Sequence, residues 1–419
     1  MGRAGDRRGP PVLNPVIVIP SYWAESDAPA KIGEVGVYDH ATPVTKPLPE
    51  LETCLSSLDT VRGVLRVVVL LVCDPACEKS ARARVDGVCR QHPRLNPLVI
   101  GSAEAQLIRA AIDRAVPRLE GDPVSLRGYG AIRNMGLAVA AVLDHDVVVF
   151  LDDDEVALNE NFLIDAVYGM GLTTRQGLKI AAKSGCYLDA RNSPYASITR
   201  ARWQDRWWSK RLEFNQWMHR ALGGTRISRS NYVCGGCFCV GASVFSKVSF
   251  DPTITRGEDL DYLFNLRMHG YDVWFDSAWR VRHLPPKIPS HASRFMQDVY
   301  RWNYEVEKLA VANSIKGMRQ VRPESLRPYP SEWISPGVRA RIAHTSLRRA
   351  IAGPERLDYL RIWLHGRHVA QQWARRVASS YFSFQTYWPQ VMSSLWGDAD
   401  LARQVVKMGT PAGMGGEQE

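Results

Sequence analysis

A run of four acidic residues directly follows a short, continuously apolar segment. Val147–Leu151 is apolar throughout, and the next four residues are Asp152, Asp153, Asp154 and Glu155. A continuous apolar run predicts a strand buried on both faces, as in a parallel sheet. Carboxylates clustered at the end of such a strand repel one another unless a cation neutralises them, and Mg²⁺ or Mn²⁺ binds carboxylate and phosphate oxygens together. A solvated acidic turn or a helix N-cap is the alternative, and the preceding strand favours a metal site.

Strands and helices alternate along the first part of the chain. Short apolar runs predict strands at residues 16–19, ended by Pro20-Ser21, and at 65–72, 98–100 and 146–151. Helical spacing of apolar residues predicts helices at 51–58, 81–89, 103–119 and 131–143. This alternation predicts an α/β fold with a mostly parallel sheet flanked by helices. Ligands of such sheets bind at the carboxyl ends of the strands, so we expect the acidic run to border the site.

The composition changes at three places along the chain. Residues 1–14 begin with an Arg-, Gly- and Pro-rich stretch, and residues 409–419 are Gly-rich and polar, so we predict disorder at both ends. Strand-like runs are absent after Pro285, where an Arg-, Ala-, Leu- and Trp-rich helical pattern begins. We therefore predict an α/β domain over residues 15–285 and a helical C-terminal region over residues 286–408.

The charge and the apolar pattern limit the possible partners and location. The formal net charge is +10, which favours anionic partners, but the basic residues form no long block, so we do not expect nucleic-acid binding. No signal peptide and no membrane-spanning run is visible, and most of the eight cysteines lie in apolar or Gly-rich contexts. We therefore expect a reduced, cytoplasmic protein.

Two further motifs carry candidate catalytic chemistry. Glu258 and Asp259 lie in the first turn of a predicted helix, where a carboxylate either complements the helix dipole or acts as a general base. His283 ends the α/β part, where an imidazole can complete a metal site with Asp152 and Asp154. Alternate residues of a strand point the same way, which would direct both aspartates to that site. A lone histidine is more often a hydrogen-bonded surface residue, so the metal role depends on the acidic run.

Two segments are candidates for binding a ligand. Gly235 and Gly236 lie between cysteines that resemble half of a zinc site, but small residues that let a loop approach a ligand are the better account. Trp207 and Trp208 lie in a stretch rich in tryptophan and arginine. Aromatic faces stack on sugar rings and guanidinium groups bind phosphates. The same pattern also fits a packed core, and the two interpretations stay open.

Taken together, these motifs resemble the glycosyltransferase family 2 type of GT-A enzyme. The resemblance covers residues 15–285 and rests on the order and spacing of its motifs. They are the first strand with its Pro-x-Tyr turn, the helix "LETCLSSL", Asp74 after the second strand, "GYGAIRNMGLAVA", "FLDDDE", "CGGCFCVGASVF" and "RGEDLDYLFNLRMHGYDVWFD".

The resemblance implies a role for each candidate residue. It implies Mn²⁺ or Mg²⁺ as cofactor and a nucleotide-diphosphate sugar as donor, with an acceptor that stays unknown: a small molecule, a glycan, a lipid or a peptide. Asp259 would be the base of an inverting transfer, assisted by Glu258. The implied metal ligands are Asp152, Asp154 and His283. The implied donor-binding residues are Pro20, Ser21, Tyr22, Asp74, Arg127, Arg133, Asp152 and Asp153. The expected acceptor-binding residues are Gly235, Gly236, Trp207 and Trp208.

The chain departs from the family pattern in two places. An insertion over residues 23–50, which contains Tyr38-Asp39-His40, separates the first strand from its helix and is expected to border the donor pocket. Residues 297–302 resemble the Gln-x-x-Arg-Trp element of processive polysaccharide synthases, but with one residue too many and no membrane spans after it. We therefore exclude a processive membrane synthase.

Other interpretations carry less weight. A sugar-phosphate nucleotidyltransferase ranks second, although the first strand lacks its Gly-rich signature with Arg and Lys. A non-catalytic nucleotide-sugar or glycan-binding protein and a nucleic-acid-binding protein follow. In the C-terminal region, Leu357, Leu360 and Leu364 predict a basic amphipathic helix. We expect it to pack on the catalytic domain; a peripheral membrane surface or an oligomer contact is the alternative.

Overall fold

The computed structural model describes residues 13–26, 41–198, 202–285 and 290–414. The expected disordered ends at residues 1–12 and 415–419 lie outside these ranges, as does Tyr38-Asp39-His40 of the insertion. Within the described residues, the last helix extends to Gly409 and the chain continues to Met414.

One mixed sheet forms the centre of the molecule, in the order β4-β3-β1-β5-β9-β7-β10-β6. Four neighbouring strands, β4, β3, β1 and β5, are parallel, and β9 is antiparallel to both β5 and β7. The predicted mostly parallel sheet flanked by helices is confirmed. The strands are β1 Pro15–Ala24, β2 Thr42–Pro43, β3 Val67–Cys73, β4 Pro97–Ile100, β5 Val147–Phe150, β6 Glu155–Ala157, β7 Ala182–Leu188, β8 Ile227–Arg229, β9 Phe238–Gly241 and β10 Trp274–His283.

Strand β1 is longer than its sequence indicates, because it continues through Pro20 to Ala24 instead of ending at the proline. The backbone N–H of Ile17 donates to the carbonyl of Arg66, the residue just before β3, so the even-numbered residues of β1 direct their N–H groups toward β5. Pairing with β5 ends at Val18. The N–H that Pro20 lacks would therefore have faced a position with no partner strand, which is where a sheet tolerates proline.

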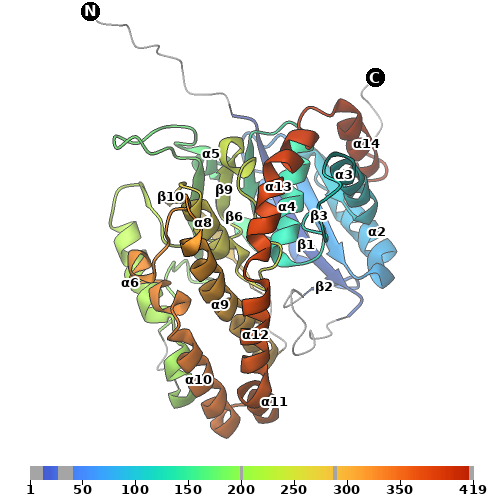
Figure 1. Cartoon of the computed structure of the whole chain (residues 1–419). Coiled ribbons are helices and arrows are strands. Elements are labelled where there is room, and N and C mark those ends of the chain that lie inside the picture. Colours follow the sequence, from blue (N-terminus) through green and yellow to red (C-terminus); the bar gives the residue numbers. More distant parts are fainter. Residues whose placement is uncertain (1–12, 27–40, 199–201, 286–289, 415–419) are drawn as a thin grey trace, which may run out of the picture.

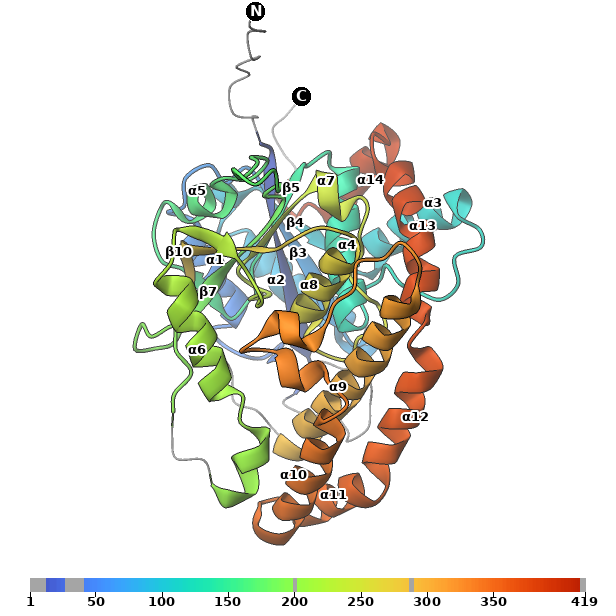
Figure 2. The same ribbon diagram turned by 60° about the vertical axis from the view of Figure 1, so that its left-hand side comes forward.

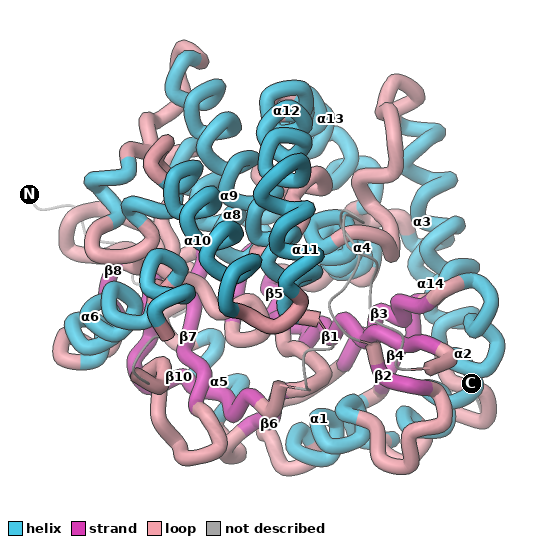
Figure 3. Tube along the Cα trace, turned by 90° about the horizontal axis from the view of Figure 1, so that it is seen from below, coloured by secondary structure: helices cyan, strands magenta, loops and turns pink. Residues whose placement is uncertain are grey.

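The alternation of β1 side chains separates two apolar cores, one on each face of the sheet. Ile17 and Ile19 pack with α1, α2 and α5, whereas Val16 and Val18 pack with α3, α4 and α8. Figure 3 shows the strands as one layer with these helices on its two sides. The bounds are α1 Glu50–Leu58, α2 Glu78–Cys89, α3 Ser102–Ala115, α4 Tyr129–Val142, α5 Phe162–Val167, α6 Arg211–Leu222, α7 Ala242–Phe245 and α8 Glu258–Met268.

The chain after β10 is helical, as the sequence predicts (Figure 1). Its helices are α9 His291–Ser314, α10 Val338–Ala352, α11 Arg356–Arg361, the π-helical segment η6 Ile362–Gly366, α12 Arg367–Val377, α13 Ser380–Leu395 and α14 Ala399–Gly409. Short 3₁₀ segments are η1 Pro75–Cys77, η2 Pro93–Leu95, η3 Trp203–Trp208, η4 Pro323–Leu326 and η5 Ser331–Ile334. In the described part of the chain, none of the helices combines the length and apolar character needed to cross a bilayer.

The C-terminal helices share one core with the sheet. Trp302 of α9 and Trp388 of α13 belong to the same apolar cluster as Val16 and Val18 of β1. A buried ion network adds to this contact: Lys308 of α9 lies 2.7 Å from the Asp251 carboxylate and 2.5 Å from that of Asp261 in α8. All three side chains are fully buried. Removing one partner would leave uncompensated buried charge, so this network fixes α9 against α8.

Candidate active site

The acidic run does not continue strand β5, and its side chains therefore point in different directions. Strand β5 ends at Phe150, and residues 153–154 form a turn closed by a 3.1 Å hydrogen bond from the Glu155 N–H to the Asp152 carbonyl. Strand β6 begins at Glu155. The expectation that Asp152 and Asp154 point the same way assumed an extended chain, and the turn removes that alternation.

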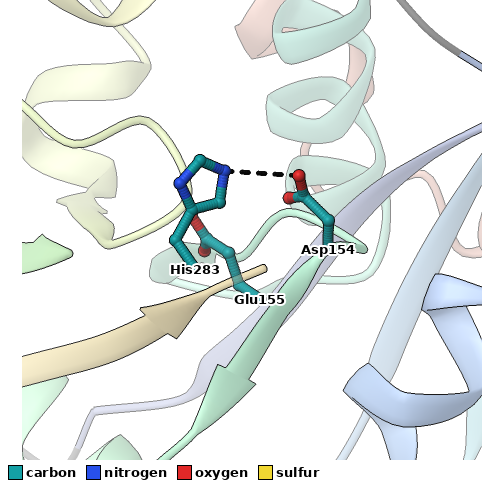
Figure 4. A group of neighbouring side chains, drawn as sticks. All are labelled: Asp154, Glu155 and His283. Carbon is teal, nitrogen blue, oxygen red and sulfur yellow. Dashed lines mark ion pairs between the residues drawn. The ribbon is translucent and has the colours of Figure 1, made fainter. Parts of the chain in front are cut away.

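Asp154, Glu155 and His283 form a compact group at the end of β10 (Figure 4). Glu155 and His283 are direct partners in the antiparallel β6–β10 pair, which places their side chains next to each other. His283 Nε2 lies 3.3 Å from Asp154 Oδ2, and one ligand atom from each of the three residues lies within 4.8 Å of the others. Asp154 and Glu155 are buried. The register of two strands therefore builds a site that a divalent cation would fit.

The surroundings of the Glu155 carboxylate are also those expected of a cation ligand. Its side chain is fully buried; Oε2 accepts a hydrogen bond from the Asp152 N–H at 3.2 Å, whereas Oε1 has no partner among the described residues. Burial, and then the neighbouring Asp152 and Asp154, raise the pKa of Glu155 well above its usual range. A buried carboxylate of this kind is costly unless a cation or a proton compensates it.

Gly235 and Gly236, the glycine pair in the turn before β9, lie directly against the group of Asp154, Glu155 and His283. A Cβ on Gly236 would lie 2.2 Å from Glu155 Oε2, so only glycine leaves room for the carboxylate. The Gly236 N–H donates to the Tyr187 hydroxyl at 3.0 Å, and the Tyr187 ring lies over His283 with ring centroids 4.9 Å apart. These contacts fix the loop and the imidazole relative to each other.

Arg133 connects the acidic run to the first turn of α8. Its Nη2 donates to Asp152 Oδ1 at 2.7 Å, and its Nε donates to Glu258 Oε1 at 3.1 Å. The guanidinium is buried, and its carbon lies 5.0 Å from the centroid of the Phe150 ring. Its Nη1 has no hydrogen-bond partner among the described residues. A buried, unpaired N–H of a guanidinium is a binding position for an anionic oxygen.

The side chain of Asp153 is directed toward β1 and not toward the group of Asp154, Glu155 and His283. Its Oδ2 accepts a 2.7 Å hydrogen bond from the Ser21 hydroxyl, and the Ser21 oxygen accepts one from Trp23 Nε1 at 2.8 Å. Burial, and then Asp154, raise the pKa of Asp153 well above its usual range. These two predicted donor-binding residues therefore bond to each other and hold the acidic turn against β1.

Asp259 lies at the N-terminus of α8, close to the glycine pair. Gly257, the N-cap residue, has a φ of +67°, and a Cβ there would lie 1.9 Å from Arg301 Cζ. Arg301 Nη2 donates to the Gly257 carbonyl at 3.2 Å. Burial raises the pKa of Asp259, and the positive charge of Arg301 opposes that rise. A Cβ on Gly235 would lie 3.3 Å from Asp259 Cβ, so the loop passes directly over this side chain.

The remaining predicted donor-binding residues differ in how far they are exposed. Asp74 and Arg127 have exposed side chains, whereas Pro20 and Tyr22 are buried in β1. Burial raises the pKa of Tyr22 well above its usual range, and the Arg133 charge opposes that rise.

The two tryptophans contact the C-terminal helices. Trp207 stacks on His344 of α10 with centroids 5.2 Å apart, and Trp208 packs edge-on against Phe295 and Trp333. The packing interpretation of this stretch therefore has direct contacts to support it.

A cavity of about 570 Å³ opens beside His283. Its lining is largely aromatic and apolar, and it includes Cys234, the residue before the glycine pair. The main side chains around it are those of Tyr187, Tyr195, Phe214, Met218, Tyr232 and Leu284.

Three residues of the site were not predicted from the sequence: Glu155, Tyr187 and Arg301. The sequence contained a signal for two of them, because Glu155 ends the acidic run and Arg301 lies in the Gln-x-x-Arg-Trp-like segment. Tyr187 had none, since its position depends on the pairing of β7 with β10.

Comparison with known proteins identifies one family. A family model described as "Glycosyltransferase like family 2" matches residues 51–304, more than half of the chain. No curated protein matches the sequence. Among solved structures, the mannosyltransferase PcManGT from Pyrobaculum calidifontis, in complex with GDP-Man and Mn²⁺, is 16% identical over 92% of this chain and 88% of that chain, with a TM-score of 0.43. GalNAc-T7 with UDP, GalNAc and Mn²⁺ is 11% identical over 77% and 54%, with a TM-score of 0.39.

Proposed function

Because the chain belongs to the glycosyltransferase-like family 2 and has the GT-A architecture expected of it, we propose that it transfers a sugar from a nucleotide-diphosphate sugar to an acceptor hydroxyl. Transfer proceeds with inversion and with a divalent cation, Mn²⁺ or Mg²⁺. The supporting observation is a pair of buried, unpartnered polar atoms on the two sides of one glycine pair. They are Glu155 Oε1, which needs a cation, and Arg133 Nη1, which needs an anion.

The proposed metal ligands are Asp154, Glu155 and His283. When bound, the cation supplies positive charge that stabilises the departing diphosphate. Asp152 remains a candidate ligand or ribose contact, but its bond to Arg133 favours a role in orienting that guanidinium. Glu155 thus replaces Asp152 in the proposed ligand set.

Arg133 is the proposed diphosphate contact. Its Nη2 and Nε are fixed by Asp152 and Glu258, so its remaining N–H is held in one direction. A guanidinium held in this way binds a phosphate oxygen without losing further side-chain freedom. Arg127, the other candidate, is exposed and has a weaker claim.

Asp259 is the proposed general base. It accepts the proton of the acceptor hydroxyl as that oxygen attacks the anomeric carbon, while the bond to the diphosphate oxygen breaks. The carboxylate must be ionised to do this, and the nearby Arg301 favours the ionised form. Glu258 assists indirectly by holding Arg133.

The cavity beside His283 is the proposed acceptor site. It shares His283 with the metal group, and Cys234 of its lining precedes Gly235, the residue that contacts Asp259. An acceptor bound there would direct a hydroxyl toward the base. Its aromatic lining suits the apolar face of a sugar or an apolar aglycone.

The first experiment is a thermal-shift panel. The wild-type protein and Asp154→Ala are melted with UDP-, GDP- and dTDP-sugars, each with and without Mn²⁺. We expect a stabilisation by one nucleotide that requires Mn²⁺ and is lost in Asp154→Ala. If no donor stabilises the wild-type protein, the glycosyltransferase assignment of this site is wrong.

A further inference from the structure

The helical hairpin formed by α10, α11 and η6 exposes a row of leucines. Leu357, Leu360 and Leu364 are 71%, 38% and 47% exposed. Their spacing of three and four residues places them on one face of the continuous helix α11–η6. Single exposed leucines are ordinary in proteins, but three in one row form an apolar stripe. The helix does pack on the rest of the protein, through Tyr359 and Ile362, which belong to the same apolar cluster as β1, whereas the three leucines lie on its exposed face.

The region around the leucine stripe is strongly basic. Residues 338–377 contain nine arginines and two carboxylates, Glu355 and Asp358, which gives a net charge of +7 against +10 for the whole chain. Both carboxylates are engaged: Glu355 accepts hydrogen bonds from Ser290 and from the first N–H groups of α9, and Asp358 pairs with Arg361 at 3.0 Å. Five arginines are paired too: Arg339 and Arg375 with Glu307, Arg341 with Glu332, Arg349 with Asp205 and Arg361 with Asp358. The positive charge that faces a partner therefore comes from Arg348, Arg356, Arg367 and Arg376, which form no ion pair among the described residues.

Aromatic residues lie next to the same hairpin. Trp203 of η3 is exposed, and its carbonyl accepts a hydrogen bond from Arg348 of α10 at 3.5 Å. Figures 1 and 2 both show α10 and α11 at the end of the molecule opposite α14. Exposed leucine, tryptophan and arginine at one protruding end are the residues that membrane-surface helices use.

We propose that the leucine stripe and the arginines around it bind the surface of an anionic lipid bilayer. The leucines would enter the boundary between headgroups and acyl chains, and the arginines would pair with lipid phosphates and other anionic headgroups. This binding requires no ionic ligand other than the lipid headgroups. The proposal does not depend on the reaction assigned above.

Flotation of the purified full chain with lipid vesicles tests the proposal. We expect the wild-type protein to float with vesicles of phosphatidylcholine and phosphatidylglycerol, and not with phosphatidylcholine alone. Leu357→Ser/Leu364→Ser should lower the affinity by about tenfold or more, because each leucine loses its transfer from water. The matched control is Leu65→Ser, a 61% exposed leucine in the loop before β3, which should float as the wild type does.

A second variant keeps the test informative if the leucine variant misfolds. Arg356→Gln/Arg361→Gln should lower the affinity for the anionic vesicles by roughly fivefold per charge. A wild-type protein that stays with the unbound fraction, or a leucine variant that floats equally well, would overturn the proposal. So would a wild-type dimer in lipid-free light scattering that Leu357→Ser/Leu364→Ser converts to monomer, since the stripe would then be a self-association surface.

Discussion

Replacing Gly236 by alanine tests whether Glu155 binds the metal. The added Cβ would lie 2.2 Å from Glu155 Oε2 and 2.5 Å from Oε1, and 3.4 Å is the lower end of ordinary contact. The carboxylate must therefore move by about 1.2 Å, whereas metal–ligand distances tolerate only ~0.2 Å. Gly236 does not have a positive φ, so alanine adds no backbone strain.

The expected loss follows from that displacement. Mn²⁺ affinity should fall by about 10–100-fold, and turnover by roughly 100-fold, as for other displacements of about 1 Å in an active site. Isothermal titration calorimetry with Mn²⁺ measures the first, and release of nucleoside diphosphate measures the second. Thermal unfolding without metal should change little, because the strained contact can relax by moving one side chain.

A matched control exists in strand β9, which begins two residues after Gly236. Gly241 of β9 has only ordinary contacts, at 3.6 Å or more, around a Cβ built on it. Gly241→Ala should therefore leave both Mn²⁺ affinity and turnover unchanged. If Gly236→Ala binds Mn²⁺ as tightly as the wild type, Glu155 is not a ligand and the proposed metal group is wrong.

Four other predictions concern the base and the buried ion network. Asp259→Asn should lower turnover by about 10²–10⁴-fold while donor binding in the thermal-shift assay stays intact, and an equal loss of donor affinity would refute the base role. Because the base must be ionised and burial raises the pKa of Asp259, kcat/KM should rise with pH through a value above the ordinary aspartate range. Arg301→Gln removes a charge that lowers this pKa, so the acid limb of the pH profile should move to higher pH; an unchanged limb would contradict the assignment. Lys308→Met leaves buried aspartates uncompensated and should cost about 3–5 kcal/mol in urea unfolding, whereas the exposed Lys407→Met should cost little.

The sequence predicted those parts of the fold that depend on local patterns. The strand over residues 146–151, the helices over residues 51–58 and 131–143, and the helical region after Pro285 follow from local patterns, and the structure has them as β5, α1, α4 and the helices from α9 on. The insertion of the antiparallel β9 between β5 and β7 was not predictable in this way, because strand order depends on contacts between segments far apart in the chain.

The candidate site, too, has some features that follow from local sequence patterns and others that depend on contacts between distant segments. The acidic run, the helix start at Glu258 and the histidine at the end of β10 carry local signals. Which carboxylates face which partner depends on a turn at residues 153–154 and on the register of β6 against β10. Neither follows from residue spacing, so Glu155 was missed as a candidate ligand and Asp152 was favoured.

The packing of α14 on β4 has a consequence for how this chain folds during synthesis. A Cβ on Gly409 would lie 2.8 Å from the Leu98 side chain and from the Val99 carbonyl, so the helix rests directly on that strand. The two segments are separated by some 300 residues, which a ribosome adds in roughly 15–60 s. Throughout that interval the apolar surface that α14 later covers on β4 and α3 is open to other chains. We therefore expect newly made protein to be prone to aggregation until the last helix is synthesised, and chaperones to lower that risk.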